Sequence, residues 1–167
     1  YAPRQNLDEN EYQLAAYALG KDYHDIVKDK LRQLANSIGA VDCRHESSEN
    51  NSPDTNDNPI RCRIFVDSGP VLERYWAEQA GLGWIGRNHQ LIIPYAGSMF
   101  FLGELFLSVE LEYDSPMPNR CGNCHKCIDA CPTAAIQPYP ATFDAERCLS
   151  YQLIENRGTL SEEAQQA

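Results

Sequence analysis

Four cysteines stand close together between Cys121 and Pro132, in the pattern C-x2-C-x2-C-x3-C-P. Three thiolates three residues apart on a tight loop, at Cys121, Cys124 and Cys127, can bind the irons of one iron–sulfur cluster. In the bacterial two-cluster arrangement, the fourth cysteine of such a run binds the other cluster. The spacing therefore predicts iron–sulfur chemistry, with Cys131 directed to a second cluster.

Zinc is the main alternative for this cysteine run, since C-x2-C pairs also form zinc sites. Structural zinc sites usually combine two separated pairs, whereas this run is compact and ends in Cys-Pro. A disulfide framework is disfavoured because the rest of the composition is not that of a small secreted scaffold. Two further cysteines, Cys43 and Cys62, stand alone in the sequence and are interpreted as small buried side chains.

A second candidate for chemistry is Asp67, which follows the apolar run that ends at Val66 and precedes Ser68-Gly69-Pro70. An acid at this position can cap the helix expected next, or it can donate a proton at the edge of a pocket. Both interpretations remain open from the residues alone. His24, in the first turn of an expected helix, is open in the same way between a surface role and a site role.

Three glycines lie within the segment 81–88, GLGWIGRN. The segment follows an expected helix and leads into an expected strand, which is the reverse of the order in a dinucleotide-binding fingerprint. Dense glycines instead indicate that the backbone closely approaches another segment or a flat ligand.

The apolar pattern predicts the elements that position these groups. Residues 11–38 have helical periodicity interrupted near 20–22, and Gly39 ends the helix; residues 41–59 form a polar loop. A strand over 60–66 leads to a helix over 71–80, with Pro70 in its first turn. Residues 90–95 and 99–111 are expected to be neighbouring antiparallel strands, the second of them central and covered on both faces. A linker at 114–118 precedes the cysteine run, and further helices begin near 144 and over the last residues.

Composition excludes several classes of function. The 167 residues carry a formal net charge of −10, which argues against non-specific nucleic-acid binding through bulk charge. No apolar run is long enough to span a membrane, and no signal peptide is recognised at Tyr1. Clustered cysteines without an export signal favour metal ligation in a reducing compartment, so we expect a cytoplasmic protein. Two clusters need four thiolates each, and the cysteine run with Cys148 supplies too few, which predicts that the chain is a fragment.

The sequence resembles the epoxyqueuosine reductase family over nearly the whole chain. The resemblance rests on the segments YALGKDYH (17–24), VDSGPVLER (66–74), AGLGWIGRN (80–88), GSMFFLGE (97–104), CGNCHKCIDACPTAAI (121–136) and RCLSYQLIE (147–155). A polar insert around 46–58 departs from the family pattern, as does Arg87, where lysine is usual.

The resemblance implies an oxidoreductase that reduces the epoxide of epoxyqueuosine at the tRNA wobble position to the alkene of queuosine. Electrons would pass from an external donor through two [4Fe-4S] clusters to a cobalamin. The resemblance places Asp67 as the proton donor to the leaving oxygen, which fits the need to protonate a strongly basic alkoxide. A carboxyl group with that role needs a partly desolvated setting, which we expect the strand end beneath a corrin to supply.

The family pattern also implies the remaining site residues. Cys121, Cys124 and Cys127 would bind one cluster, and Cys131 and Cys148 the other. Asp67, Asn88, Leu91, Leu102 and Ser150 would line the cobalamin pocket, and Arg157 would contact tRNA phosphate. Leu91 and Leu102 are equally well explained as ordinary core residues.

We therefore expect a monomeric α+β protein with no membrane contact. An antiparallel-rich sheet with flanking helices would form a cobalamin-binding domain over 1–113, followed by a partial ferredoxin-like iron–sulfur domain over 114–167. Two alternatives remain. A stand-alone ferredoxin-type electron-transfer module gives no role to residues 66–104, and a corrinoid reductive dehalogenase-like enzyme would act on small organohalides.

Overall fold

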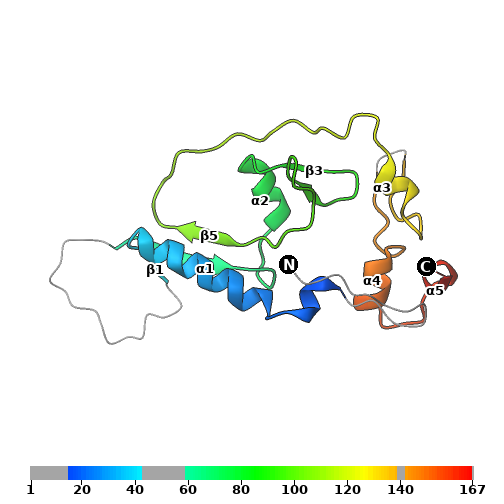
Figure 1. Ribbon diagram of the computed structural model, residues 1–167, viewed down its shortest axis with the longest axis horizontal. Helices are drawn as coiled ribbons and strands as arrows, with labels where there is room; N and C mark the ends of the chain where they lie inside the picture. Colours follow the sequence, from blue (N-terminus) through cyan, green and yellow to red (C-terminus); the bar gives the residue numbers. More distant parts are fainter. Residues whose placement is uncertain (1–14, 43–58, 139–141, 167) are drawn as a thin grey trace. The chain divides into compact units, whose positions relative to one another are not determined.

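The structure is a computed structural model that describes residues 15–42, 59–138 and 142–166 (Figure 1). It consists of two compact units. The first comprises the described residues up to Glu73 together with Phe100–Tyr113, and the second comprises Arg74–Met99 and the described residues from Asp114 onward. The segment 74–99 thus clusters with the cysteine run, whereas the sequence places it in the first of two functional domains. That functional division, at 113/114, stays a prediction.

The first unit begins with a broken helix, as the sequence predicts. The 3-10 helix η1 (Ala16–Leu19) is separated from α1 (Tyr23–Ser37) by a bend at Gly20. The carboxylate of Asp22 caps α1 by accepting the backbone N–H of His24 at 2.9 Å. Gly39 follows the helix with a φ of 69°, a left-handed conformation that favours glycine.

A small three-stranded sheet completes this unit, in the order β1-β2-β5. Its strands are β1 (Val41–Asp42), β2 (Arg61–Phe65) and β5 (Glu104–Leu107). β2 is central, parallel to β1 and antiparallel to β5. Cys62 and Ile64 alternate inward along β2, and Cys62 packs with Ala35 and Ala40, which confirms its expected burial. β1 was expected to be loop; its two residues are too few for a period-two pattern to be recognised.

One expected strand pairing is wrong. Leu91 and Ile92, in β4 (Leu91–Ile92), pair across a tight turn with β3 (Trp84–Ile85), whereas β5 pairs with β2. β5 is also an edge strand rather than a central one, and Phe106 on it is 45% exposed. A long apolar run does not reveal which partner a strand will choose, because that choice depends on burial against distant segments.

The second unit contains β3, β4 and several short helices. These are α2 (Glu73–Gln79, whose first residue belongs to the first unit), α3 (Lys126–Asp129), α4 (Leu149–Ile154) and α5 (Glu162–Gln166). α2 begins at Glu73, so Pro70 lies before its first turn and Asp67 is too far away to cap it. A Cβ on Gly83 would overlap the carbonyl oxygen of Ile92, which confirms the close backbone approach expected of the glycine-rich segment.

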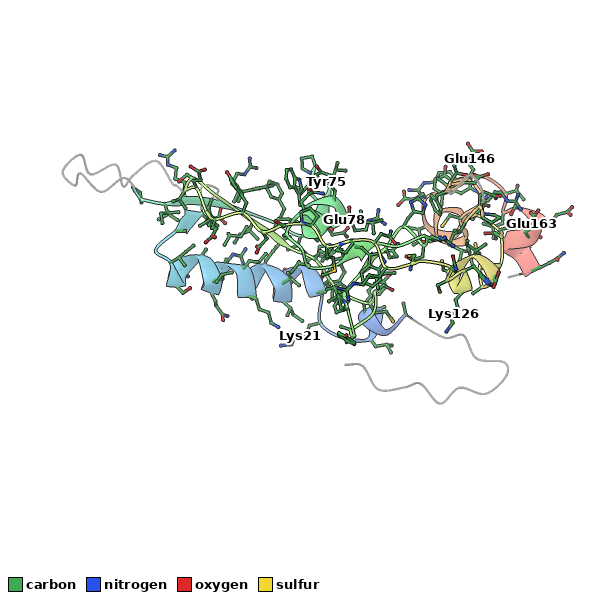
Figure 2. The ribbon with its side chains drawn as sticks, turned by 90° about the horizontal axis from the view of Figure 1, so that it is seen from above. Lys21, Tyr75, Glu78, Lys126, Glu146 and Glu163 are labelled. Carbon is green, nitrogen blue, oxygen red and sulfur yellow. The ribbon has the colours of Figure 1, made fainter. Side chains whose placement is uncertain are left out.

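Side chains of the second unit are drawn in Figure 2. Glu78 on α2 accepts the backbone N–H of Ile85 at 2.8 Å and so ties α2 to β3. Lys126, at the start of α3, points away from the helix (Figure 2) and is exposed. The fold is thus α+β with two small sheets, in which two of the three strand pairings are antiparallel. Among the residues that the structure describes, no helix is long and apolar enough to cross a membrane.

Candidate functional sites

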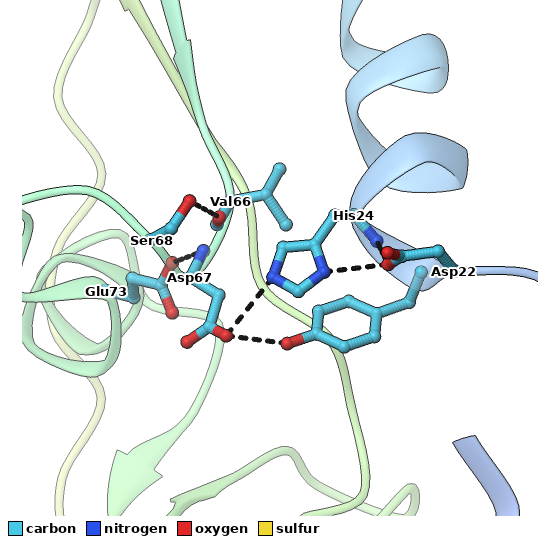
Figure 3. Close-up of polar contacts among 7 residues, drawn as sticks. Asp22, His24, Val66, Asp67, Ser68 and Glu73 are labelled. Atoms are coloured by element: carbon cyan, nitrogen blue, oxygen red, sulfur yellow. Dashed lines mark hydrogen bonds and ion pairs between the residues drawn. The ribbon is translucent and has the colours of Figure 1, made fainter. Parts of the chain in front are cut away.

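Asp67 lies at the centre of a polar cluster in the first unit (Figure 3). Its backbone has a φ of 57°, in the left-handed region that aspartate tolerates better than most residues. Its N–H donates to Oε1 of Glu73 at 2.5 Å, which holds the turn after β2 in this conformation. The carboxylate faces away from this bond and toward the start of α1.

Two side chains of α1 reach the Asp67 carboxylate. The hydroxyl of Tyr23 donates to Oδ2 at 2.6 Å, and Nε2 of His24 lies 3.3 Å from the same oxygen. The hydrogen bond to Asp67 raises the pKa of Tyr23 to about 12, so this tyrosine remains a donor at neutral pH. Phe101 stacks on the Tyr23 ring with a centroid separation of 4.2 Å and fixes its plane.

His24 connects two acids. Its Nδ1 lies 2.7 Å from Oδ1 of Asp22, and its Nε2 faces Asp67 (Figure 3). A doubly protonated ring donates to both carboxylates, whereas a ring that keeps only its Nδ1 proton can accept a proton from Asp67. The arrangement can therefore exchange a proton with Asp67. The structure brings His24 into contact with the candidate acid Asp67, and a role of His24 in a site stays a prediction.

The setting of Asp67 differs from the one that the sequence led us to expect. The side chain of Asp67 is 61% exposed, whereas a partly desolvated acid was expected at this strand end. The cause is the positive φ, which turns the carboxylate outward from the end of β2. The desolvated carboxyl group of this unit is a different one, that of Glu104.

Glu104 opens β5, opposite Phe65 of β2. Its Oε2 is buried and has no hydrogen-bond partner among the described residues. Desolvation, reinforced by the negative charge of Glu73, raises the pKa of Glu104 to about 7. Tyr23 and Glu104 lie in segments 17–24 and 97–104, which carry the family resemblance. The sequence did not mark either one as a site residue, because their contacts join distant segments.

We expect the stability of the chain to fall as pH rises from about 4.5 to about 7, because the folded state retains the Glu104 proton that the unfolded chain releases. The stabilisation is fully present below the pKa of Glu104 in the unfolded chain, and it is lost as the pH rises through the pKa of Glu104 in the folded chain. Since the side chain is partly exposed, the expected loss is about 1 to 3 kcal/mol. The free energy of unfolding, measured with urea at pH 5 and pH 8, should no longer show this dependence in the variant Glu104→Gln. The matched variant Glu112→Gln, in the exposed segment after β5, should retain it; a Glu104→Gln variant with the wild-type dependence would contradict the assignment.

In the second unit, the predicted residues Asn88, Cys131, Cys148 and Ser150 line one open cavity of about 300 Å³. Arg74 also lines it and donates to the carbonyl oxygen of His89 at 2.6 Å. Leu91 is 4% exposed on β4, as its core interpretation requires. Leu102 and Asp67 belong to the first unit, so a common pocket for all the predicted cobalamin residues stays a prediction. Arg157 is exposed in the turn after α4.

The sulfur of Cys131 accepts hydrogen bonds from the residues that follow it in the chain. The N–H of Ala135 lies 3.2 Å from Sγ, and the Thr133 hydroxyl lies 3.9 Å away. Partial burial raises the pKa of the Cys131 thiol, but hydrogen bonds from the backbone of Ile136 and Ala135 and from Thr133 outweigh it, so the net shift is downward. A thiol whose anion is favoured is suited to ligate a metal.

The donor set fits iron–sulfur clusters. The five cysteines of the predicted ligand set form no disulfide in this structure. Within the described ranges, no three Cys, His, Asp or Glu side chains converge on a single metal ion. Cluster ligation does not need such convergence, since each thiolate of a [4Fe-4S] cluster binds a different iron. Cys121, Cys124, Cys127, Cys131 and Cys148 can therefore serve as one-per-iron ligands.

The cysteine run, with hydrogen-bond donors at the sulfurs of Cys121 and Cys131, is typical of iron–sulfur proteins. The family model described as "4Fe-4S double cluster binding domain" matches residues 120–167. The model described as "Epoxyqueuosine reductase QueG, DUF1730" matches residues 1–68. The chain is thus related to the epoxyqueuosine reductases, as its sequence segments indicate.

Individual relatives agree. Epoxyqueuosine reductase of Leadbetterella byssophila is 43% identical over 163 residues, which are 98% of this chain and 48% of the relative. That of Pseudomonas aeruginosa is 46% identical over 149 residues, or 88% of this chain and 37% of the relative. The chain spans about half the length, or less, of the curated relatives it matches.

Solved structures agree as well. Epoxyqueuosine reductase from Streptococcus thermophilus matches with a TM-score of 0.66 and 35% identity, over 86% of this chain and 34% of that one. A crystal structure of epoxyqueuosine reductase with a tRNA-Tyr epoxyqueuosine-modified stem loop matches with a TM-score of 0.66 and 33% identity, over the same shares. These likenesses confirm the α+β fold, and the family model over residues 120–167 supports the iron–sulfur domain. The cobalamin pocket stays a proposal.

Proposed function

We propose that the protein containing this chain reduces epoxyqueuosine to queuosine in tRNA, and that the chain supplies its acid and part of its electron path. The observation that carries the proposal is Asp67, held in a left-handed turn by Glu73 and contacted by Tyr23 and His24. Its support from outside the chain is the similarity to epoxyqueuosine reductases over 98% of its length. Because the substrate is a tRNA, the reaction belongs in the cytoplasm.

The acid answers the main chemical demand of the reaction. Reducing an epoxide to an alkene consumes two electrons and two protons and releases the oxygen as water. The oxygen leaves as a strongly basic alkoxide, so a proton donor within hydrogen-bond reach lowers the barrier. Asp67 would supply that proton, Tyr23 would orient its carboxyl group, and His24 would return a proton to it after turnover.

The remaining roles follow the predicted ligand sets. Cys121, Cys124 and Cys127 would hold one cluster and Cys131 and Cys148 the other, carrying single electrons from an external donor. A cobalamin, when bound, would supply a strongly reducing cobalt centre for the substrate carbon. The amide of Asn88 and the hydroxyl of Ser150 would hydrogen-bond its polar periphery, since both residues line one open cavity. Arg157 would contact tRNA phosphate, and the protein would act as a monomer.

The direct test uses the protein containing this chain, reconstituted without oxygen with iron, sulfide and cobalamin. Incubated with a chemical reductant, it should convert epoxyqueuosine in tRNA to queuosine, measured by mass spectrometry of the digested tRNA. Omitting cobalamin should abolish conversion, which separates the reductase from a ferredoxin-type carrier. Conversion of a chlorinated organic substrate in place of the tRNA would overturn the proposal in favour of a dehalogenase.

A further inference from the structure

The strand β3 and the turn after it are bonded to the loop that contains the first cysteines. Trp84 donates its indole N–H to Sγ of Cys121 at 3.4 Å. The carbonyl oxygen of Ile85 accepts from the Asn119 amide at 3.1 Å, while Oδ1 of Asn119 accepts the N–H of Cys121 at 2.9 Å. All three bonds lie within the second unit, and those made by Trp84 and Ile85 join residues more than thirty positions apart in the sequence.

Arg87 adds a bidentate contact to the same loop. Its Nη1 donates to the carbonyl oxygen of Cys124 at 3.0 Å, and its Nη2 donates to that of Gly122 at 2.8 Å. A planar guanidinium can bind two carbonyl groups at once, which a lysine ammonium does less well. The loop between Cys121 and Cys124 is thereby held in one conformation by a cation.

The contact of Trp84 with sulfur has an electronic consequence. Indole N–H is a donor only, and this side chain is 9% exposed, so the sulfur is its partner in a largely dry setting. A hydrogen bond to a cluster thiolate strengthens as negative charge accumulates on the cluster, and it therefore favours the reduced form. Hydrogen bonds to the sulfurs and nearby charge are among the features that set cluster potentials.

We propose that Trp84 and Arg87 are positioning residues that hold the first cluster in place and raise its reduction potential. The inference rests on the proposed ligation of a cluster by Cys121, Cys124 and Cys127. It gives the glycine-rich segment 81–88 a role toward the cluster, in addition to the place in the cobalamin pocket that the resemblance implies for Asn88. The close approach allowed by Gly83 sets β3 against β4 and so fixes Trp84 relative to the loop.

The test is a redox titration of the reconstituted protein, followed by electron paramagnetic resonance of the reduced cluster. In Trp84→Phe, which keeps an aromatic ring and loses the N–H, the ratio of reduced to oxidised first cluster at fixed potential should fall about threefold to tenfold, tenfold being 59 mV for one electron. The matched variant Trp76→Phe changes a tryptophan that is 52% exposed on α2, and it should keep the wild-type ratio. An unchanged ratio in Trp84→Phe with the cluster intact would overturn the role of the indole.

Arg87 keeps the inference testable if Trp84→Phe does not fold. Arg87→Gln should lower the reduced fraction of the first cluster and release iron to a chelator faster than the wild type does. The variant loses both the positive charge and the pair of hydrogen bonds that the guanidinium donates to the loop. Arg87→Lys should keep the reduced fraction near wild type and release iron faster than wild type. Arg32→Gln, which removes the same charge from α1 beside Asp29, should change neither quantity. If Arg87→Gln retains iron as well as the wild type does and its first cluster keeps the wild-type reduction potential, the inference about Arg87 is overturned, but the proposed cluster ligation is not. If the wild-type protein itself binds no cluster, the proposed ligation is overturned.

Discussion

Replacing Asp67 by asparagine should lower kcat for epoxyqueuosine reduction by about a hundredfold or more, the range attributed to a general acid. The amide retains the size of the carboxyl group, and its carbonyl can still accept the Tyr23 hydroxyl, but it has no proton that it can readily transfer. Substrate conversion under saturating tRNA, with cobalamin content measured by absorbance, is the relevant assay. The cobalamin content should equal that of the wild type.

Two variants show whether the loss belongs to this acid. Asp29→Asn makes the same chemical change on α1, at an exposed pair with Arg32, and should leave kcat unaltered. Tyr23→Phe keeps Asp67 but removes its 2.6 Å hydrogen bond, and a loss of about tenfold to a hundredfold is expected, in line with one hydrogen bond to a charged group. Full turnover in Asp67→Asn would remove Asp67 as the proton donor and leave the family assignment standing. Loss of cobalamin in that variant would instead mark Asp67 as a binding residue.

Changing one cysteine of the run should remove one cluster and leave the other. In Cys127→Ser, the reconstituted protein should lose about four iron atoms per chain, because serine is a poor replacement for a thiolate ligand. Cys131→Ser should lose a similar amount from the other cluster, and the two variants should differ in their reduced-state paramagnetic spectra. Both should lose epoxyqueuosine reduction, since the electron path is broken in each.

Cys43→Ser is the matched control, because the proposed ligand sets give Cys43 no role. It should keep the wild-type iron content and activity. Wild-type iron in Cys127→Ser would contradict the assignment of the first three cysteines to a common cluster. Identical spectra in Cys127→Ser and Cys131→Ser would contradict their division between two clusters.

Several elements were predictable because their signals are local. Helix caps, glycine positions and short-range periodicity predict four of them: the break near Gly20, the start of α1 at Tyr23, the strand Arg61–Phe65 and the C-terminal helix. The pairing of β4 with β3 was not, because residues 90–95 and 99–111 have strand composition without information on their partners. In the structure, a tight turn after β3 brings β4 against β3, and β5 pairs with β2 instead.

The sequence by itself determined the iron–sulfur chemistry, because the spacing of Cys121, Cys124, Cys127 and Cys131 limits how thiolates on one loop can reach a metal cluster. It also singled out Asp67 as a residue at the end of a strand. Only the tertiary structure decided what surrounds these groups. Tyr23 meets Asp67 across 44 positions, and Trp84 meets Cys121 across 37. Such contacts depend on which distant surfaces are buried together, which no local pattern of residue types encodes.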